Sequence, residues 1–318
     1  MRQFVTGGAG FIGSNYIRHV LKTTDDQVTV YDALTYAGNL STLRDVDDDR
    51  RFAFVKGNIC DPGTLEEAMA GHDAVVHFAA ESHVDRSIAG PDDFINTNCF
   101  GTNIVMDTAR RLEISRVIHI GTDEVYGSIE VGSSKESDPL EPRSPYSASK
   151  AGSDLVALSY HHTYGLPVTV TRCTNNFGPY QYPEKAIPLF TTNLIEGKRI
   201  PLYGDGLNQR DWLYVDDHCA GVLLVLRDGA VGEIYNIGAG NETPNRVLVD
   251  KLLALLGAGE DMVEYVEDRL GHDRRYSVDI EKVTALGWRK RRTLDEALEA
   301  TVEWYRSNEW WWRPLKSA

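Results

Sequence analysis

The chain has 318 residues, of which 42% are hydrophobic and 25% charged, and its formal net charge is -14 at pH 7. That length suits one large or two modest domains, and the composition is that of an ordinary globular protein. The acidic balance argues against a nucleic-acid partner, because a phosphate backbone is bound by an excess of basic side chains. A small anionic ligand stays possible, since a few arginines can line one pocket; the candidates are Arg210, Arg269, Arg274 and Arg275.

Four cysteines are scattered along the chain without a CxxC pair: Cys60, Cys99, Cys173 and Cys219. This spacing argues against a zinc site or a disulfide framework, so we expect no bound metal and a reducing compartment. The N-terminus lacks a basic segment followed by an apolar one, and no apolar run approaches the roughly 18 residues that span a membrane. We therefore expect a cytoplasmic protein that makes no membrane contact.

A glycine-rich turn separates the first expected strand, residues 3–6, from the first expected helix. Residues 7–13 of this turn follow the pattern G-x-x-G-x-x-G, which lets backbone N–H groups approach a pyrophosphate at a helix N-terminus. A second expected strand, residues 27–31, ends in Asp32. Its carboxylate can accept hydrogen bonds from an adenosine ribose and would repel a 2′-phosphate, although it could simply cap its loop. The pattern predicts a dinucleotide site that prefers NAD to NADP.

The remaining segments alternate between strand and helix patterns up to about residue 172. Further strands are expected at 52–55, 74–78, 117–120 and 168–172, and helices at 93–112 and from Pro145 onward. Beyond them we expect a loop at 175–181, a loop or hairpin at 201–206, and strands at 211–214 and 234–237. Helices are expected at 187–196, 217–226, 244–257 and 294–306. Trp310, Trp311 and Trp312 could stack on a sugar, but we expect them to anchor a terminal helix.

This alternation predicts an α/β protein built on a Rossmann-type, doubly wound parallel sheet. We expect an NAD-binding domain over residues 1–172, to which segments near 211–237 return. A smaller, mixed α/β substrate-binding domain is expected over residues 173–318.

Two polar clusters are expected to meet at the carboxyl edge of the sheet. Thr122, Asp123 and Glu124 follow an apolar strand, at the edge where open α/β sheets bind ligands. Tyr146 and Lys150 are four residues apart, so a helix places them on one face. Tyrosine, with a pKa of about 10, is a poor base at neutral pH, but a nearby ammonium and a positively charged nicotinamide favour the phenolate. The pair suits alcohol oxidation, with Thr122 sharing the substrate hydroxyl and Lys150 reaching the nicotinamide ribose.

The adjacent carboxyl groups of Asp123 and Glu124 are not needed for oxidation alone. Oxidising a sugar carbinol to a ketone acidifies the neighbouring C–H, so a carboxylate can remove that proton while a carboxylic acid protonates a leaving hydroxyl one carbon further along. Adjacent carboxyl groups tend to separate in pKa, which supplies one charged and one protonated group. The enone product can take the hydride back. We therefore predict a lyase that uses NAD catalytically. Taken alone, the acidic pair would fit a solvated loop better, and it is the surrounding motifs that favour the catalytic interpretation.

At this point the sequence resembles the extended short-chain dehydrogenase/reductase superfamily and, within it, the dTDP-glucose 4,6-dehydratase family. The matching segments span nearly the whole chain: 7–13, 34–39, 79–88 (AAESHVDRSI), 122–127 (TDEVYG), 146–150, 175–185 (NNFGPYQYPEK), 203–217 and 271–276 (GHDRRY). TDEVYG discriminates most, because sister enzymes usually differ at the position of Asp123. The chain departs from the family pattern at Asn58, Gly121 and Ala186, where Asp, Ser and Leu are usual, which bears on affinity more than on reaction class.

The resemblance implies a role for each catalytic residue. Tyr146, assisted by Thr122 and Lys150, is the base at the sugar C4 hydroxyl. Glu124 removes the C5 proton, and Asp123 protonates the C6 hydroxyl as water leaves. Hydride passes from C4 to NAD and returns to C6, which converts dTDP-glucose to dTDP-4-keto-6-deoxyglucose and water. The family is typically a homodimer, which implies pairing through helices that include residues 94–112 and 146–163.

The resemblance also implies two sets of binding residues. The expected NAD contacts are Gly7, Gly10, Phe11, Ile12, Gly13, Asp32, Leu34, Thr35, Asn39, Asn58, Ile59, Phe78, Ala79, Ala80, Ser82, Thr97, Tyr146, Lys150 and Asn176. The expected sugar-nucleotide contacts are Ser82, Thr122, Asn175, Glu184, Lys185, Pro201, Tyr203, Arg210, Asn245, Arg269, His272 and Tyr276. Of these, Asn245 and His272 could instead only cap or pack the smaller domain.

Two other functions are compatible with parts of this pattern. A sister enzyme, such as a UDP-glucuronate decarboxylase or a 4-epimerase, would share the pair Tyr146 and Lys150. Neither reaction needs an acid at C6, however, which is the role that Asp123 would serve. A regulator that senses NAD without turnover would be expected to lack Tyr146 or Lys150, and both are present.

Overall fold

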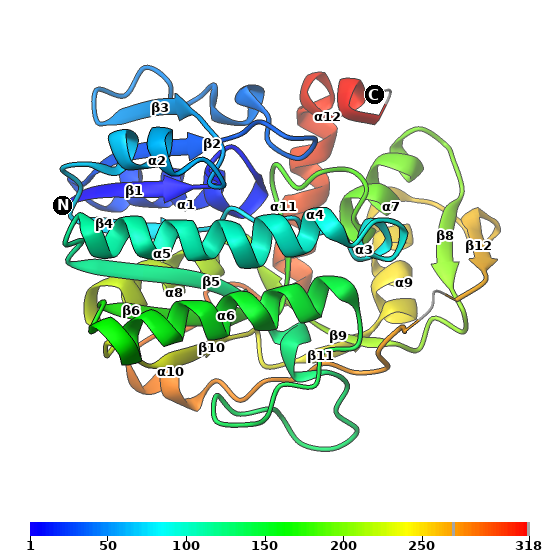
Figure 1. Ribbon diagram of the computed structural model, residues 1–318. Coiled ribbons are helices and arrows are strands. Elements are labelled where there is room, and N and C mark those ends of the chain that lie inside the picture. The colour runs from blue at the N-terminus through cyan, green and yellow to red at the C-terminus, as the bar shows by residue number, and fades with distance from the viewer. Residues whose placement is uncertain (269–270, 317–318) are drawn as a thin grey trace.

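The computed structural model describes residues 1–268 and 271–316, and Figure 1 labels the elements of this part of the chain. Its central sheet has seven parallel strands in the order β10-β6-β5-β4-β1-β2-β3. Their bounds are Ile234–Ile237 (β10), Val168–Cys173 (β6), Arg116–Thr122 (β5), Ala74–His77 (β4), Arg2–Thr6 (β1), Gln27–Asp32 (β2) and Phe52–Lys56 (β3). Most are short runs rich in β-branched residues, as expected of strands covered on both faces.

The strand order reverses between β1 and β4. From β1 the chain continues outward through β2 and β3, and it then returns to place β4 on the other side of β1. Thr6 is paired with Tyr31 of β2 and with His77 of β4, so the carboxyl ends of these three strands meet at one edge of the sheet. An open α/β sheet binds its ligands in the crevice at such a reversal.

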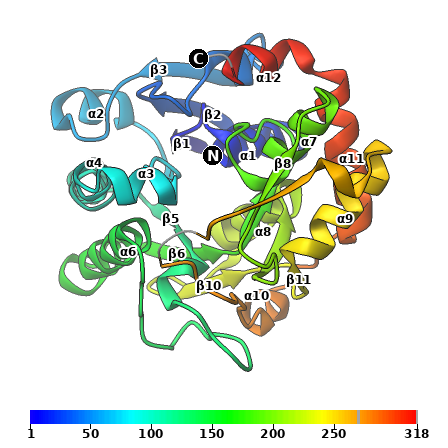
Figure 2. The ribbon, with the colours of Figure 1, turned by 90° about the vertical axis from the view of Figure 1, so that its right-hand side faces the viewer.

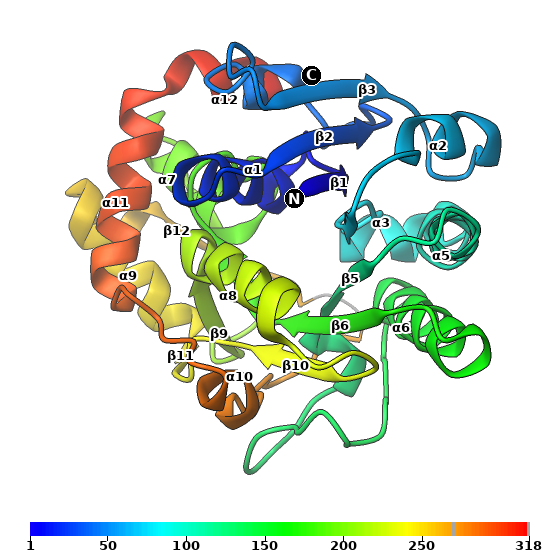
Figure 3. The same ribbon diagram turned by 90° about the vertical axis from the view of Figure 1, so that its left-hand side faces the viewer.

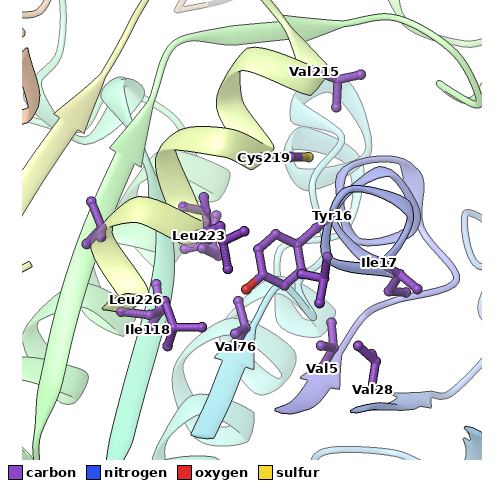
Figure 4. Close-up of a cluster of buried hydrophobic side chains, with 14 of the residues drawn as sticks. Val5, Tyr16, Ile17, Val28, Val76, Ile118, Val215, Cys219, Leu223 and Leu226 are labelled. Atoms are coloured by element: carbon purple, nitrogen blue, oxygen red, sulfur yellow. The ribbon is translucent and has the colours of Figure 1, made fainter. Parts of the chain in front are cut away.

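Helices cover both faces of this sheet, as Figure 3 shows. One face carries α1 (Phe11–Thr23), α8 (Val215–Asp228) and α10 (Glu281–Ala285); the other carries α2 (Pro62–Met69), α5 (Thr102–Arg111) and α6 (Pro145–Tyr164). Figure 4 shows the core of the first face, where Tyr16 of α1 lies close to Leu223 of α8 and to Val76 of β4. The sequence-based prediction of a doubly wound, Rossmann-type sheet is therefore confirmed.

A second group of elements encloses a separate hydrophobic cluster, at the right of Figure 1. A mixed three-stranded sheet combines β7 (Asn175–Phe177), β9 (Gln209–Tyr214) and β11 (Glu242–Pro244), and β8 (Ile200–Tyr203) pairs in parallel with β12 (Val263–Val266). The helices α7 (Ala186–Ile195), α9 (Asn245–Leu256) and α11 (Leu294–Ser307) contribute to the same cluster, and Figure 2 shows them on the right-hand side of the molecule. Shorter helical segments are η1 (Leu40–Leu43), α3 (Val84–Ala89), η3 (Asp123–Tyr126) and η4 (Glu260–Met262).

Several expected elements of this second group were assigned wrongly from the sequence. The segment 175–181, expected as a loop, begins with strand β7. The segment 201–206, expected as a loop or hairpin, contains most of β8, which pairs in parallel with the distant β12. Of the segments near 211–237, α8 and β10 lie with the large sheet, whereas β9 belongs to the three-stranded sheet. The boundary between two domains near residue 172 stays a prediction.

The single long helix expected at 93–112 is divided by a π-helix. The structure has α4 (Asp92–Phe94), the π-helix η2 (Ile95–Gly101) and then α5. Within η2, the buried Asn98 accepts a hydrogen bond from the Glu81 N–H (2.8 Å) and donates to the Glu81 carbonyl (3.0 Å) and to the Ser149 hydroxyl (2.8 Å). A π-turn commonly marks a functional site, and here it ties the loop after β4 to α6.

The three consecutive tryptophans lie in a terminal helix, α12 (Glu309–Lys316). Trp311 and Trp312 are buried, and their indole N–H groups donate to the Thr42 hydroxyl (3.3 Å) and to the Tyr305 carbonyl (2.7 Å). Trp310 is the exposed member. The expectation that aromatic residues anchor a terminal helix is confirmed.

Candidate active site

A cavity of about 330 Å³ lies where the strand order of the large sheet reverses. Its wall is formed by residues at or just after the carboxyl ends of β1 to β6, together with Thr97 of η2 and the start of α6. The start of β7 and part of the segment between β7 and α7 complete it. Both polar clusters predicted from the sequence, Thr122–Glu124 and the pair Tyr146 and Lys150, contribute to this wall. The fold therefore brings the glycine turn and the catalytic candidates into one cavity.

In the glycine turn, the backbone lies very close to the segment after β4 and to itself. Gly7 has a φ of +71°, and a Cβ atom there would lie 2.5 Å from the Ala79 nitrogen. A Cβ atom at Gly13 would lie 2.4 Å from the Gly7 carbonyl oxygen, so neither position admits a side chain. Gly10, which precedes α1, caps that helix without a side-chain hydrogen bond. The N-terminus of α1 at the cavity wall is therefore suited to a pyrophosphate.

Asp32 joins the end of β2 to the glycine turn. Its carboxylate accepts hydrogen bonds from the N–H groups of Ala9 (2.9 Å) and Leu34 (2.8 Å), and burial raises its pKa above the usual value. Asp32 also lines the cavity. A glycine turn that admits no side chain, followed by a carboxylate at the end of the second strand, fits the pyrophosphate and adenosine ribose of NAD.

The catalytic candidates lie at the end of β5 and in the first turns of α6. Thr122 ends β5 and caps η3: its hydroxyl accepts from the Glu124 N–H (3.4 Å) and donates to Asp123 (3.3 Å). Ser144 and Ser147 form a capping box that begins α6, and Pro145 occupies the first turn. This start places Tyr146 at the cavity, where its hydroxyl forms a hydrogen bond with Thr122.

The environment of Asp123 favours the protonated form of its carboxyl group. The residue is only 2% exposed, and its Oδ2 atom has no hydrogen-bond partner among the described residues. Burial, and then the neighbouring carboxyl groups of Glu124 and Asp211, raise the pKa of Asp123 well above its usual value. A carboxylic acid that keeps its proton beside a second carboxyl group can serve as a general acid.

The surroundings of Tyr146 in the protein alone favour the protonated form of its hydroxyl. Burial, and then the charge of Glu124, raise the pKa of Tyr146 well above its usual value. The expectation that Lys150 and a bound nicotinamide together favour the phenolate stays a prediction. The amine of Lys150 donates to the Ile120 carbonyl (2.6 Å), and burial lowers its pKa. Within the protein alone, Tyr146 therefore holds its proton more firmly than a solvated tyrosine does.

The cavity wall contains nearly all the predicted NAD contacts; the two exceptions are Leu34 and Asn39. Leu34 donates its N–H to Asp32, and its φ is +56°. The Asn39 side chain caps η1 by accepting from the Ser41 N–H (3.0 Å), and its own N–H donates to Ala9. Both residues shape the loop beside the glycine turn without lining the cavity.

The predicted sugar-nucleotide contacts fall into two groups. Five of them line the cavity: Ser82, Thr122, Asn175, Glu184 and Lys185. Outside its wall lie Pro201, Tyr203, Arg210, Asn245, His272 and Tyr276, and Arg269 falls outside the described residues. The structure thus does not bring the whole predicted set into one cavity.

Two of the residues outside the cavity wall, Arg210 and Tyr276, interact electrostatically with the catalytic carboxyl groups. The Arg210 guanidinium stacks 4.4 Å from the centre of the Tyr276 ring and donates to the Asp273 carbonyl (2.8 Å). Its charge opposes the rise in the pKa of Asp123, while burial and then the charge of Glu124 raise the pKa of Tyr276. Arg210 and Tyr276 therefore lie near the catalytic carboxyl groups, although they do not line the cavity.

His272 and Asn245 differ in what they offer to a ligand. The Nδ1 atom of His272 lies 2.7 Å from the Asn208 amide nitrogen and 2.5 Å from an Asp268 carboxylate oxygen, and its ring meets Tyr203 edge-on. These contacts fit the alternative that His272 packs within the smaller group of elements. The buried Oδ1 atom of Asn245 has no hydrogen-bond partner in the described chain, so it can accept from a ligand.

Sequence reasoning missed several residues of the cavity wall. They include Tyr31, Glu81, Cys173, Gln181 and Tyr182. Tyr31 and Cys173 lie at the carboxyl ends of β2 and β6, so the rule that ligands bind beyond strand ends gave a signal for them. Gln181 and Tyr182 lie in the segment between β7 and α7, whose placement depends on tertiary packing.

Two other kinds of site are not found among the described residues. No cluster of three or more His, Cys, Asp or Glu side chains is arranged to hold a metal ion there. Among the same residues, no helix has both the length and the apolar character needed to cross a bilayer.

Comparisons with known proteins agree with this geometry. The family model described as GDP-mannose 4,6 dehydratase matches residues 4–301. The dTDP-glucose 4,6-dehydratase of Streptomyces niveus is 53% identical to this chain, covering 100% of the chain and 96% of the relative. That of Streptomyces antibioticus is 54% identical, covering 99% of the chain and 96% of the relative.

Solved structures show the same relationship. DesIV, a dTDP-glucose 4,6-dehydratase from Streptomyces venezuelae crystallised with NAD, has a TM-score of 0.97 and 56% identity over 99% of this chain and 100% of that one. The UDP-glucose 4-epimerase of Thermus thermophilus with NAD has a TM-score of 0.90 but only 28% identity, over 97% of this chain and 100% of that one. The chain thus belongs to the GDP-mannose 4,6 dehydratase family and, within it, stands among the dTDP-glucose 4,6-dehydratases.

Proposed function

We propose that this protein is a dTDP-glucose 4,6-dehydratase, a hydro-lyase that converts dTDP-glucose to dTDP-4-keto-6-deoxyglucose and water with NAD as a catalytic cofactor. The observation that carries the proposal is the buried carboxyl group of Asp123, which keeps its proton in the same cavity as Tyr146 and Lys150. Oxidation of an alcohol needs no such acid, whereas the loss of a poor leaving group such as hydroxide does. Full-length identity above 50% to dTDP-glucose 4,6-dehydratases supports the choice of substrate.

The residues that would hold NAD are the glycine turn 7–13, Asp32 and Lys150. They fit its pyrophosphate, its adenosine ribose and its nicotinamide ribose, respectively. When bound, NAD supplies an acceptor for the hydride from C4 and a donor of hydride to C6, and its positive nicotinamide lowers the pKa of a neighbouring phenol. That last effect counters the burial that raises the pKa of Tyr146.

Each catalytic side chain handles one proton in this proposal. Tyr146, with its hydrogen bond to Thr122, takes the proton of the C4 hydroxyl as that carbon is oxidised. Glu124 takes the C5 proton, can exchange it with solvent, and later gives a proton back to C5. Asp123 gives its proton to the C6 oxygen, which leaves as water. The proton gained by Tyr146 balances the one lost by Asp123, so exchange with solvent restores both groups after each turnover.

The direct test is to incubate the purified protein with dTDP-glucose, without added NAD, and to follow the sugar nucleotide by mass spectrometry. We expect the loss of one water molecule per sugar nucleotide and no net formation of NADH. If no water is lost even when NAD is added, the proposal is wrong. UDP-glucose and UDP-glucuronate are then the next substrates, because loss of carbon dioxide from the latter would identify a decarboxylase.

We further propose a cytoplasmic location. The four cysteines of the described chain are all free thiols, as a reducing compartment would keep them.

We also propose that the protein forms a homodimer through the face that carries η2, α5 and α6. Apolar side chains are exposed there, with Ile95 at 50%, Phe100 at 49% and Leu155 at 59% exposure. The helices α5 and α6 lie side by side at the front of Figure 1. Exposed apolar groups gathered on one face are typical of an interface between subunits.

Replacing Leu155 by Glu is expected to shift the protein from twice the mass of one chain to the mass of a single chain. A charge placed in an apolar interface loses its hydration without gaining a partner. Size-exclusion chromatography with light scattering measures the mass. The control is Val131→Glu, because Val131 is 86% exposed but lies in the loop between η3 and α6. If the Leu155 variant keeps the mass of the unmodified protein, this face is not the interface.

A further inference from the structure

A group of buried polar side chains lies close to the catalytic residue Lys150. The proposed reaction does not use this group. Asp154 is 0% exposed, Arg172 2% and His119 1%. The Asp154 carboxylate accepts from the Arg172 Nε–H (2.8 Å), and its other oxygen lies 3.2 Å from Nε2 of His119. Arg172 also donates to the Tyr126 hydroxyl (2.7 Å). A buried ion pair is weak evidence for stability, because desolvation offsets much of its attraction, so its presence beside a catalytic site raises the question of function.

Asp154 and Lys150 reach the same stretch of β5. They are four residues apart on α6, which places them on one face of that helix. The Lys150 amine donates to the Ile120 carbonyl (2.6 Å). The next residue is Gly121, where a Cβ atom would lie 2.9 Å from an Asp154 carboxylate oxygen. Gly121, where the family usually has Ser, thus leaves space for this carboxylate next to the lysine.

The charges in this buried group do not cancel. Six other titratable groups lie near Asp154 and Lys150 of α6. They are His77 of β4, His119 of β5, Arg172 and Cys173 of β6, Tyr126 of η3 and Cys99 of η2. Burial lowers the pKa of both histidines and raises the pKa of both thiols, so these four groups are neutral. Burial likewise raises the pKa of Tyr126, to about 12. Two cations, Lys150 and Arg172, therefore share one anion, Asp154.

We propose that Asp154 is a positioning residue of the dehydratase: its carboxylate, fixed by Arg172, is the counter-ion that keeps the buried amine of Lys150 charged at the cavity wall. The inference rests on the proposed function, in which Lys150 holds the nicotinamide ribose. Without Asp154, two like charges would be buried together. Arginine does not release its proton in proteins, so Lys150 would become neutral. A neutral lysine loses its attraction for the phenolate of Tyr146 and one of its hydrogen-bond donors.

The direction of the pKa shifts agrees with this role. Burial lowers the pKa of Lys150, and the charge of Asp154 is the first of the effects that oppose the decrease. Burial disfavours ionisation of Asp154, but the nearby His119 ring and the charges of Arg172 and Lys150 outweigh it and lower its pKa. Asp154 is thus held as an anion although it is fully enclosed.

The test compares Asp154→Asn with Arg172→Met, because both substitutions break the same ion pair but change the charge near Lys150 in opposite directions. The loss of activity at alkaline pH reports the deprotonation of Lys150. In the Asp154 variant we expect this loss to begin at a pH lower by about one unit or more, with kcat reduced about tenfold or more at neutral pH and KM little changed. In the Arg172 variant the alkaline loss should stay in place or move to higher pH.

A second readout does not depend on turnover. After removal of bound cofactor, NAD affinity is measured against pH by quenching of tryptophan fluorescence. The Asp154 variant should lose affinity at a lower pH than the unmodified protein does. If Asp154→Asn does not fold, the double variant Asp154→Asn/Arg172→Met is compared with Arg172→Met alone. The two differ only at position 154, and the double variant should show the lower alkaline limit.

Each outcome decides one question. If Asp154→Asn keeps the alkaline limit of the unmodified protein in turnover and in NAD affinity, or if both variants weaken at all pH values alike, the role of Asp154 is only structural and the inference is overturned. If the unmodified protein releases no water from dTDP-glucose, the proposed function fails. The pH dependence of NAD affinity then still decides whether Asp154 holds the charge of Lys150.

Discussion

Replacing Asp123 by Asn is expected to slow the release of water from dTDP-glucose by about 10²–10⁴-fold, the usual contribution of a general acid. The amide has the shape of the acid but no proton to give to the C6 oxygen. Tyr146 and Lys150 keep their positions, so oxidation at C4 should still take place. Rapid mixing of the variant with substrate should therefore produce the absorbance of NADH without release of water, which mass spectrometry follows on the same samples.

The same substitution should not weaken the fold. The pKa of Asp123 in the folded protein lies above its value in the unfolded chain, mainly because of burial. The unfolded chain therefore releases this proton first, and the stability of the fold decreases as pH rises between the two pKa values. Asparagine has no proton to lose, so the melting temperature of the variant at neutral pH should equal or exceed that of the unmodified protein.

A matched control for Asp123→Asn is Glu124→Gln, which leaves the acid in place and removes the base expected at C5. Both variants should allow C4 oxidation. Only the glutamate variant should also lose exchange of the C5 proton with deuterated solvent, because Glu124 takes up that proton. An Asp123 variant that released water at the full rate would show that the acid is another group.

The large sheet and its ligand edge were predictable because their signals are local. The strand at 117–120 and the glycine turn at 7–13 are each recognised within a few residues. The alternation of such segments with helices leaves few possible topologies, since parallel crossovers have a fixed hand. Asp32, Thr122 and Tyr146 follow directly, because each lies at a strand end or in the first turn of a helix at that edge.

The smaller group of elements was less predictable because its strands are defined by distant partners. Ile200–Tyr203 becomes β8 only by pairing with Val263–Val266, and Asn175–Phe177 becomes β7 only by pairing with β9. Neither short segment has an alternating pattern of its own. The π-helix η2 is another such case, since Asn98 meets Glu81 and Ser149 only after the loop, η2 and α6 have packed together.

The pKa of Tyr146 in the protein alone could not be predicted from the motif. A motif identifies which groups are near one another, but not how deeply each is buried. In the structure without NAD, burial and then the charge of Glu124 raise the pKa of Tyr146. The depth of burial of Tyr146 depends on the packing of α6 against Ser87 and Phe94, which no local pattern reveals.

Replacing Tyr146 by Phe is expected to reduce turnover of dTDP-glucose by about 10²–10⁴-fold, because it removes the base at C4. Unlike Asp123→Asn, it should abolish both the NADH signal and the release of water, since oxidation at C4 comes first. In the unmodified protein the rate should rise with pH up to the alkaline limit set by Lys150, because a raised pKa keeps Tyr146 protonated at neutral pH and the phenolate is the active form. The small residual rate of the variant should lack this dependence.

The matched control is Tyr160→Phe, which removes a hydroxyl from the same helix. The Tyr160 hydroxyl donates to the Asn103 side chain (3.0 Å), and the residue lies outside the cavity wall. Turnover of this variant should stay within about twofold of the unmodified protein, since surface hydrogen bonds contribute little. If Tyr146→Phe still formed NADH at the original rate, the C4 proton would have to leave by another route. Thr122, the hydrogen-bond partner of Tyr146, would then be the next group to test, with Thr122→Val.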